Sequence, residues 1–338
     1  MVGGWWCTGP SWDGGEPGLG WYAPDRGVRR RSALPAGKGL AFAVVGERRC
    51  LGVRRGARWT ACPYAAVIDG RRTRDQCADC ARLDRSRSVA ADTMADDPRT
   101  YGVYLAYFGP GLLKVGITAA ERGAARLVEQ GAVTYAWLGY GPLMAARRAE
   151  TLLGTALDVR DRFGKAEKRA ARTALPPVPE RAAALAELHG AARGLAGWPE
   201  ALEPVAFAWT DHTEVFGLGR IPATGVGEVE GLVAGDEVVG TVVAGVGADV
   251  YVRGAGDAGG AGDSGGAGVA GNVGGAGGAG GAGGVGGTGV LVVDGRLLAG
   301  WVLRGAVGGV TTAGVRAAGK GAGGEDRGGG EGAQGSLF

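Results

Sequence analysis

The stretch GVYLAYFGPGLLKVGIT, residues 102–118, decides the fold of the central part of this chain. Its two apolar runs, 102–108 and 112–118, are rich in β-forming residues and flank the turn sequence Gly-Pro-Gly. This pattern is typical of a β-hairpin. The residues that follow, 119–130, have the composition of a helix. We therefore expect two strands and then a helix.

A third strand and a second helix are expected next. VTYAWLGY at 133–140 has the pattern of a strand, and the segment 142–161 opens with proline and predicts a long helix. One face of this helix is apolar except for Arg147 and Glu150. A carboxylate on a packed face is costly unless a charge pairs with it. The charge that pairs with Glu150 is therefore either a bound metal ion or the guanidinium of Arg147.

Glycine is distributed unevenly along the chain. Of 338 residues, 71 are glycine, and 20 of these fall within the 36 positions 254–289. The glycines keep no strict period of three, which excludes a collagen helix. A segment of this composition cannot bury enough apolar surface to fold. We expect a disordered insert at 254–289 and a disordered tail at 317–338.

Composition also divides the rest of the chain. Residues 1–37 are rich in Gly and Trp without helical or strand periodicity, and their tryptophans either cover an apolar edge or stack on bases. Towards the C-terminus, Asp294-Gly295 between two β-like runs predicts a hairpin. The expected fold class is α+β, in five parts: a Gly/Trp-rich segment (1–37), a four-cysteine zinc module with a linker (38–99), an α/β domain with a helical extension (100–198), a small β module that contains the insert (199–316), and the tail (317–338).

Four of the five cysteines have the spacing of a metal site. Cys50, Cys62, Cys77 and Cys80 form a C-x11-C-x14-C-x2-C series, and a tight turn can present the close pair to one tetrahedral zinc ion. The alternatives are ordinary thiols or a C-x2-C redox pair, which usually lies in a βαβ setting that the sequence does not indicate here. Four thiolates leave no open position, so the predicted zinc is structural. Cys7 lies outside the spacing and is expected to be free, and His189 and His212 have no nearby partner ligands.

The net charge of +3 hides a strong asymmetry. Residues 26–87 carry 16 basic and 5 acidic side chains, whereas residues 199–338 carry 7 basic and 15 acidic ones. A basic segment of this kind either binds a polyanion, with DNA or RNA the first candidate, or docks onto the acidic part of the same chain. The candidate phosphate contacts are Arg54, Arg55, Arg58, Arg71, Arg72 and Arg74.

Nothing in the sequence indicates a membrane segment. No stretch approaches the roughly 20 uninterrupted apolar residues that span a bilayer. The first residues, MVGGWWCTGPSW, lack the basic start and apolar run of a signal peptide. We expect a cytoplasmic protein without a membrane partner.

The central unit resembles the GIY-YIG nuclease superfamily. The resemblance rests on GVY (102–104) in the first strand, KVG (114–116) in the second, an arginine in the first helix and a glutamate in a later helix. It implies a small three-stranded antiparallel sheet flanked by helices. Lys114 stands where the second motif of that superfamily has tyrosine.

The resemblance also implies an activity and its residues. The superfamily cleaves phosphodiesters with one divalent ion, Mg²⁺ or Mn²⁺, and Glu150 matches its metal-binding glutamate. Tyr104 would orient or deprotonate the attacking water, and Lys114 would hold the phosphate. Arg126, with Arg122 as second choice, would stabilise the charge on the phosphate oxygens. The alternative is a zinc-stabilised nucleic-acid-binding protein that keeps the fold without cleavage.

A second resemblance covers more of the chain. The zinc cysteines, the strand segments VYLAYF and KVGIT, the helix arginine, the EQGA segment at 129–132 and the trailing β-rich part together resemble the domain of unknown function 2797 family. This resemblance extends roughly over residues 38–305, apart from the Gly-rich insert.

Overall fold

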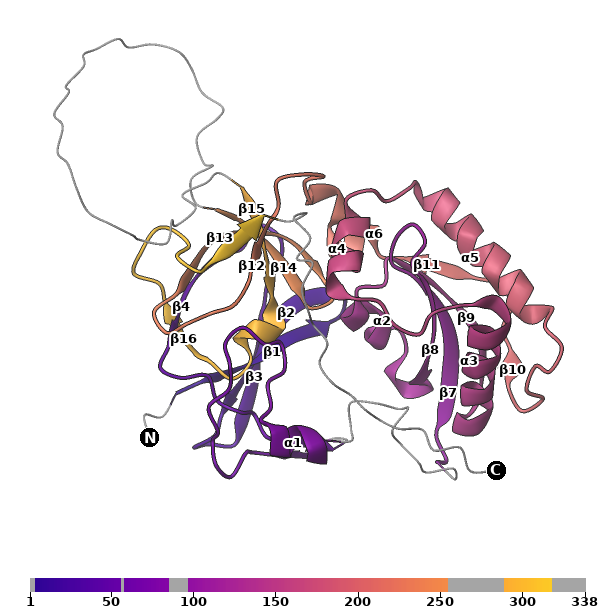
Figure 1. Ribbon diagram of the computed structural model, residues 1–338, viewed down its shortest axis with the longest axis horizontal. Coiled ribbons are helices and arrows are strands. Elements are labelled where there is room, and N and C mark those ends of the chain that lie inside the picture. Colours follow the sequence, from indigo (N-terminus) through magenta and orange to yellow (C-terminus); the bar gives the residue numbers. More distant parts are fainter. Residues whose placement is uncertain (1–3, 56–57, 85–96, 255–288, 318–338) are drawn as a thin grey trace, which may run out of the picture.

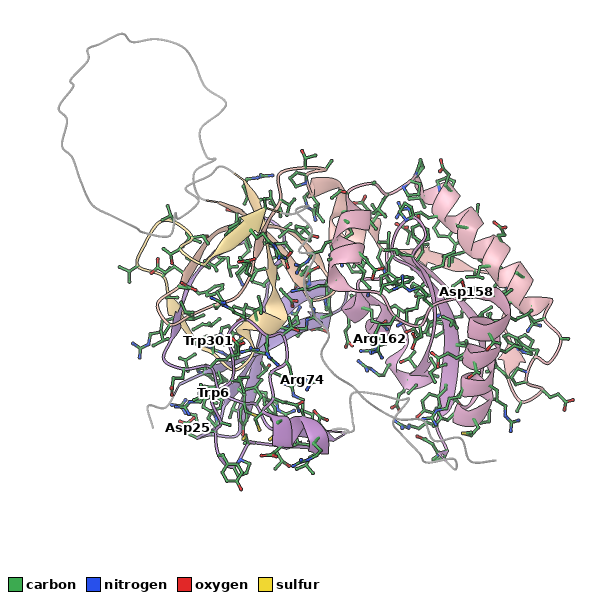
Figure 2. The ribbon with its side chains drawn as sticks, in the orientation of Figure 1. Trp6, Asp25, Arg74, Asp158, Arg162 and Trp301 are labelled. Carbon is green, nitrogen blue, oxygen red and sulfur yellow. The ribbon has the colours of Figure 1, made fainter. Side chains whose placement is uncertain are left out.

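The computed structural model describes residues 4–55, 58–84, 97–254 and 289–317, which form a mixed α+β structure (Figure 1). A ten-stranded sheet occupies one side of the molecule, and a five-stranded sheet with its helices occupies the other. Figure 2 shows Trp6 and Trp301 on the first side and Asp158 and Arg162 on the second. In the described part of the chain, no helix has the length and apolar character needed to cross a membrane.

The five-stranded sheet contains the expected central unit. Its antiparallel core has the order β9-β7-β8, and two short strands pair with β9. The strands are β7 (Thr100–Tyr107), β8 (Leu113–Ala119), β9 (Thr134–Pro142), β10 (Glu203–Pro204) and β11 (Trp209–Asp211). The predicted hairpin and third strand are thus confirmed, and the sheet is larger than the three strands expected.

Helices cover both faces of this sheet. α3 (Leu143–Leu157) and α5 (Val178–Arg193) pack on the face that carries Val103 and Leu105, and α2 (Ala125–Gln130) packs on the face that carries Tyr104. The expected helix at 119–130 is divided into a 3-10 turn, η2 (Ala120–Arg122), and α2, because Gly123 between them has φ +46°. α3 ends four residues earlier than expected, at a left-handed Asp158.

The ten-stranded sheet combines strands from both ends of the chain. Its order is β17-β12-β15-β14-β13-β4-β16-β1-β2-β3. The expected parts 1–37, 38–99 and 199–316 therefore share one sheet, while their boundaries stay a prediction. The strands are β1 (Trp6–Asp13), β2 (Glu16–Ala23), β3 (Val28–Ala33), β4 (Gly39–Val45), β12 (Gly227–Val229), β13 (Glu237–Val246), β14 (Asp249–Gly254), β15 (Val290–Asp294), β16 (Val302–Gly305) and β17 (Val315–Ala317).

One expectation for these segments is wrong, and another segment forms strands that its sequence pattern does not indicate. The N-terminal residues form β1–β3, although their sequence shows no strand period, because a register shift between Cys7 and Gly9 interrupts the alternation. Asp294-Gly295 makes no hairpin, since β15 pairs with β14 whereas β16 pairs with β4 and β1. The Asp294 side chain instead accepts a hydrogen bond from the backbone N–H of Arg296 and starts a 3-10 helix, η5 (Gly295–Leu298).

The remaining elements connect the two sheets. The four-cysteine segment holds β5 (Val53–Arg55), β6 (Arg58–Thr60) and α1 (Ala78–Leu83). α4 (Lys165–Arg172) lies between the sheets, and α6 (Thr213–Phe216) and η3 (Leu218–Arg220) lead back to the large one. Of the predicted insert and tail, residues 255–288 and 318–338 lie outside the described residues.

Ion pairs fix α4 to the large sheet. Arg169 and Arg172 of α4 each place a guanidinium nitrogen 2.5 Å from a carboxylate oxygen of Asp249, which begins β14. Arg169 also pairs with Glu228 of β12. Because these side chains are almost fully buried, the ion pairs hold α4 in one position on the large sheet.

Candidate functional site

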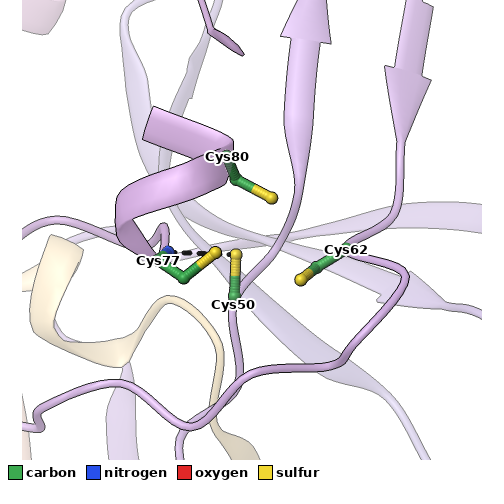
Figure 3. A group of neighbouring side chains, drawn as sticks. All are labelled: Cys50, Cys62, Cys77 and Cys80. Carbon is green, nitrogen blue, oxygen red and sulfur yellow. Dashed lines mark hydrogen bonds between the residues drawn. The ribbon is translucent and has the colours of Figure 1, made fainter. Parts of the chain in front are cut away.

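The four cysteines of the predicted zinc module converge (Figure 3). The Sγ atoms of Cys50, Cys62, Cys77 and Cys80 all lie within 4.8 Å of one another, and all but that of Cys77 belong to buried residues. Tetrahedral zinc with Zn–S bonds of about 2.3 Å separates its sulfurs by roughly 3.8 Å. The cluster therefore has the ligand type, number and spacing of a four-coordinate metal site.

Local structure explains how distant cysteines meet. Cys77 is the N-cap of α1 and Cys80 lies in its first turn, so the C-x2-C pair shares one end of the helix. The backbone N–H groups of Cys77 and Gly52 donate to the Cys50 sulfur at 3.2 and 3.4 Å. Burial raises the pKa of the Cys50 thiol to about 11, a cost that a bound cation would offset.

The segment that carries the cysteines is anchored to the large sheet by Arg48. This guanidinium is almost fully buried, and its Nε donates to the carbonyl oxygen of Ala299 at 2.7 Å. Nη1 donates to the carbonyl oxygen of Asp69 at 2.6 Å, and Nη2 donates to that of Arg296 at 3.0 Å. The cysteine segment is therefore tied to the large sheet rather than forming a free module.

A second candidate site surrounds Tyr104 on the small sheet. Tyr104 of β7 faces Gly116 of β8, and a Cβ atom on Gly116 would lie 2.4 Å from the tyrosine hydroxyl. Only glycine leaves room for the ring to cross β8 at this point. The phenol is buried and packs edge-to-face on Trp137 at 6.0 Å between ring centroids. The GVY and KVG segments thus form one packing unit.

Gln130 connects Tyr104 to Lys114. Its Nε2 donates to the Tyr104 hydroxyl at 2.8 Å, and its Oε1 accepts from Lys114 Nζ at 2.8 Å. One amide at the end of α2 therefore holds a phenol and an ammonium side by side. Burial, with the charge of Arg126 in addition, lowers the pKa of Lys114 to about 8.

Arg126 and Glu150 complete the charge environment of this site. Burial raises the pKa of Tyr104, and the charges of Arg126 and Glu150 act on it in opposite directions. Glu150 comes from α3, which contacts β8 at the edge of the sheet. Burial raises the pKa of Glu150, and the Lys114 charge opposes that rise. The charges of these residues thus influence one another, although α3, which carries Glu150, packs on the sheet face opposite Tyr104.

Two alternatives raised by the sequence can be compared with these positions. Arg122, the second choice for the helix arginine, pairs with Glu129 at 2.7 Å, and Arg126 lies 3.8 Å from the same carboxylate. Of the charges that lower the pKa of Glu150, that of Lys114 has the larger influence and that of Arg147 the smaller.

The remaining single cysteine and the histidines have structural surroundings. Cys7 is buried in β1, away from the metal cluster. His212 is buried, with Nδ1 2.8 Å from the carbonyl oxygen of Ala132, and His189 packs edge-to-face on Phe207. In the described part of the chain, neither histidine belongs to a group of potential metal ligands.

Arginine and tryptophan side chains interleave beside the cysteine segment. The guanidinium groups of Arg29 and Arg54 each lie 4.8 Å from the Trp59 ring centroid, and Arg30 lies 4.1 Å from that of Trp5. Of the basic residues singled out above, Arg71, Arg72 and Arg74 are exposed, and Arg54 pairs with buried Asp75 at 3.4 Å. Arginines of β3 and β5 thus stack on Trp59 of β6 and on Trp5, which precedes β1.

Gln130 is the site residue that sequence reasoning missed. Its signal was present in the EQGA segment that supported the family resemblance, but a glutamine in a helix carries no chemistry that singles it out. Lys168 of α4 was missed for another reason. It reaches Gln130 only in space, with its Nζ donating to the Gln130 carbonyl oxygen at 3.2 Å.

Comparison with known proteins identifies the family but not an activity. A family model described as "Protein of unknown function (DUF2797)" matches residues 37–253, which include the four clustered cysteines and the Tyr104 site. Neither a curated protein nor a solved structure matches the chain. Because the family match spans more than half of the sequence, the chain belongs to the family described as protein of unknown function, DUF2797.

Proposed function

We propose that this protein binds nucleic acid, is stabilised by a structural zinc ion, and carries a divalent-metal-dependent phosphodiesterase centre on its small sheet. The observation that carries the proposal is the pairing of Tyr104 and Lys114 by the Gln130 amide, within reach of the charges of Arg126 and Glu150. A phenol, two cations and a carboxylate are the groups that phosphodiester chemistry requires around one phosphate.

Zinc is the metal best suited to the cysteine cluster. Four thiolate ligands at tetrahedral spacing favour zinc, and they leave no position for water or substrate. The ion therefore has a structural role. It holds together the basic cysteine segment, which is too small to form a hydrophobic core of its own.

Glu150 fits a second, catalytic ion. A half-buried carboxylate with a raised pKa favours a nearby cation, and Mg²⁺ or Mn²⁺ commonly binds through one carboxylate plus substrate phosphate. When bound, such an ion acts as a Lewis acid on the scissile phosphate. This assignment follows the resemblance of the central unit to the GIY-YIG superfamily.

The other three side chains have separate roles in this proposal. Arg126, partly exposed at the end of the sheet, stabilises the charge that develops on the phosphate oxygens. Lys114 positions the phosphate through its ammonium group. Tyr104, oriented by Gln130, directs a water molecule at phosphorus.

A specific observation favours a second function, binding without cleavage. Lys114 occupies the place of the second tyrosine of the superfamily, and its Nζ is already engaged by Gln130. An ammonium at this place binds phosphate well but cannot orient water as a phenol does. In this alternative the same four residues form a phosphate-binding surface.

A cleavage assay separates the two functions. Labelled DNA and RNA are incubated with the full chain and Mg²⁺ or Mn²⁺, and the products are resolved on a gel. Glu150→Ala is expected to lower the cleavage rate by about a hundredfold or more, because the ion loses its protein ligand. Glu187→Ala, which removes an exposed glutamate from α5, is the matched control and is expected to cleave like the wild type.

Each outcome of this assay is informative. Cleavage that Glu150→Ala leaves unchanged would contradict the catalytic assignment. Binding without cleavage by the wild type in either ion would favour the second function. If the wild type neither binds nor cleaves DNA or RNA, both functions are wrong.

Binding itself should depend steeply on salt. Exposed arginines that contact phosphates release counterions, so the logarithm of the affinity falls linearly with the logarithm of salt concentration. Replacing Arg71, Arg72 and Arg74 by alanine is expected to flatten this slope by about one unit for each arginine that contacts a phosphate. Fluorescence anisotropy with a labelled oligonucleotide at several salt concentrations measures the slope.

The control for this experiment keeps the same change in net charge. Alanine replaces three exposed arginines outside the basic segment: Arg148, Arg253 and Arg304. This variant is expected to keep the wild-type slope. Equal slopes for the two triple variants would mean that net charge, rather than the basic segment, attracts the nucleic acid.

A further inference from the structure

A cavity of about 390 Å³ lies beside the Tyr104 site, between α2, α4, β1 and the turn from β13 to β14. Five basic residues line it, together with the aromatic rings of Trp12 and Phe163 and two carboxylates. The volume is within the range of small-molecule sites. The basic residues are Arg126, Lys165, Lys168, Arg172 and Arg296.

Both carboxylates of the cavity are already neutralised. Glu129 pairs with Arg122 at 2.7 Å and lies 3.8 Å from Arg126. Asp249 accepts from Arg169 and Arg172, each at 2.5 Å. The two acidic groups of the cavity therefore do not compensate Lys168, and its positive charge remains.

Lys168 is the basic residue of the cavity whose charge has no acidic partner among the described residues. Among the described residues it makes no ion pair; its Nζ donates to the Gln130 carbonyl oxygen at 3.2 Å and lies 3.8 Å from the Phe108 ring centroid. Lys165, by contrast, pairs with Glu228 at 3.4 Å, and Arg296 pairs with Asp294 at 2.7 Å. Burial lowers the pKa of Lys168 to about 7, which an anion in the cavity would reverse.

The cavity adjoins the candidate phosphodiester centre through two residues. Arg126 belongs to both, and Gln130 lines the cavity while its side chain holds Tyr104 and Lys114. A ligand in the cavity would therefore lie next to a phosphate at that centre.

We propose that this cavity binds the phosphate monoester of a nucleotide, with Lys168 as its principal cation and the Trp12 ring beside the base or sugar. If the nucleotide is the end of a nucleic-acid strand, the proposal rests on the proposed function. A free nucleotide presents the same groups to the cavity. In both sources the chemistry is the same, a phosphate that carries up to two negative charges on one end of a nucleoside. A site with several cations favours such a monoester over an internal diester, which carries one charge.

The test measures binding without divalent ions, so that it is independent of cleavage. Isothermal titration calorimetry at neutral pH compares adenosine 5′-monophosphate with adenosine, and inorganic phosphate is added as a competitor. Lys168→Met, which keeps the apolar stem over Phe108 but removes the charge, is expected to weaken binding of the monophosphate by about ten- to a hundredfold. Arg148→Ala, which removes an exposed arginine of α3 outside both the cavity and the basic segment, is the control and should bind like the wild type.

A second arm distinguishes the two sources. Short oligonucleotides with a terminal phosphate and with a terminal hydroxyl are compared by anisotropy on the wild type and on Lys168→Met. Tighter binding of the phosphorylated strand, lost in Lys168→Met, assigns the cavity to a strand terminus. Equal binding of both strands together with Lys168-dependent binding of the monophosphate assigns it to a free nucleotide.

Other outcomes overturn the proposal. It is wrong if adenosine binds as well as its monophosphate, if the wild type binds neither at millimolar concentration, or if Lys168→Met, shown to be folded by circular dichroism, binds like the wild type. The fate of the proposed function is read separately. Cleavage without monophosphate binding supports the phosphodiesterase proposal and contradicts the proposal of a nucleotide site in the cavity. Monophosphate binding without cleavage supports the nucleotide site and contradicts the phosphodiesterase.

Discussion

Cys77→Ser is expected to remove the zinc ion and to unfold the four-cysteine segment. The binding free energy of a structural zinc ion is folding free energy, about 10–16 kcal/mol in zinc-finger peptides. Little else stabilises the segment, because the core around the cluster consists mainly of the cysteines themselves and a few apolar neighbours. Serine cannot replace a thiolate ligand, and Cys50 and Cys80 would be left as buried thiols whose pKa values are raised.

Elemental analysis and thermal unfolding check this expectation. The wild type should contain one zinc per chain, and a strong chelator should lower its Tm. Cys7→Ala is the matched control, because Cys7 is buried in β1 outside the cluster and should leave the zinc content unchanged. If the purified wild type contains no zinc, or if Cys77→Ser unfolds at the same temperature as the wild type, the cluster is not a structural metal site.

The unfolding should extend beyond the cysteines. Arg48 links their segment to the carbonyl groups of Arg296 in η5 and of Ala299 directly after it, in the connection between β15 and β16 of the large sheet. If the segment unfolds, this buried guanidinium loses its partners and the sheet loses an anchor. Near-ultraviolet circular dichroism, which reports the tryptophans, should therefore change together with zinc loss.

The central unit was the part most readily predicted from sequence. Its strands are continuous runs rich in β-forming residues and the turn between the first two carries Gly and Pro, so local signals suffice for β7, β8 and β9. The cysteine cluster was also accessible, because a metal site needs only the right ligands at a usable spacing. The packing of Tyr104 against Gly116 explains why the GVY and KVG segments occur together.

The pairing of strands that are far apart in the sequence could not be predicted from local sequence patterns. β16 lies between β4 and β1, which are some 260–300 positions earlier in the chain, and no pattern in its four residues names those partners. Asp-Gly favours a tight hairpin only where the following strand returns to the first, and here the Asp294 side chain caps a 3-10 helix instead. The cavity around Lys168 combines α2, α4 and the β13–β14 turn, so it too exists only in three dimensions.

Asp249→Asn is expected to destabilise the contact between α4 and the large sheet by about 3–5 kcal/mol. The substitution removes the buried negative charge that Arg169 and Arg172 share, and both guanidinium groups are left in a largely apolar environment. Arg169 keeps Glu228, but among the residues that the structure describes Arg172 retains only the Tyr251 hydroxyl at 3.2 Å. Denaturant unfolding measures the loss. Glu230→Gln, which breaks an exposed pair with Arg316, is the control and should cost less than about 1 kcal/mol.

The same ion pairs predict how stability depends on pH. Burial by itself would raise the pKa of Asp249, but the charges of Arg172 and Arg169 outweigh it and hold this pKa at about 2, below the ordinary value of 3.8. A depressed carboxyl pKa contributes stability that is fully present above pH 4 and is lost as the pH falls towards 2, on the order of 2 kcal/mol in total. The wild type should therefore lose stability more steeply than Asp249→Asn between these pH values, as measured by urea unfolding. Parallel pH profiles for the two proteins would mean that Asp249 is not charged in the folded state, and the electrostatic account of how α4 is held would fail.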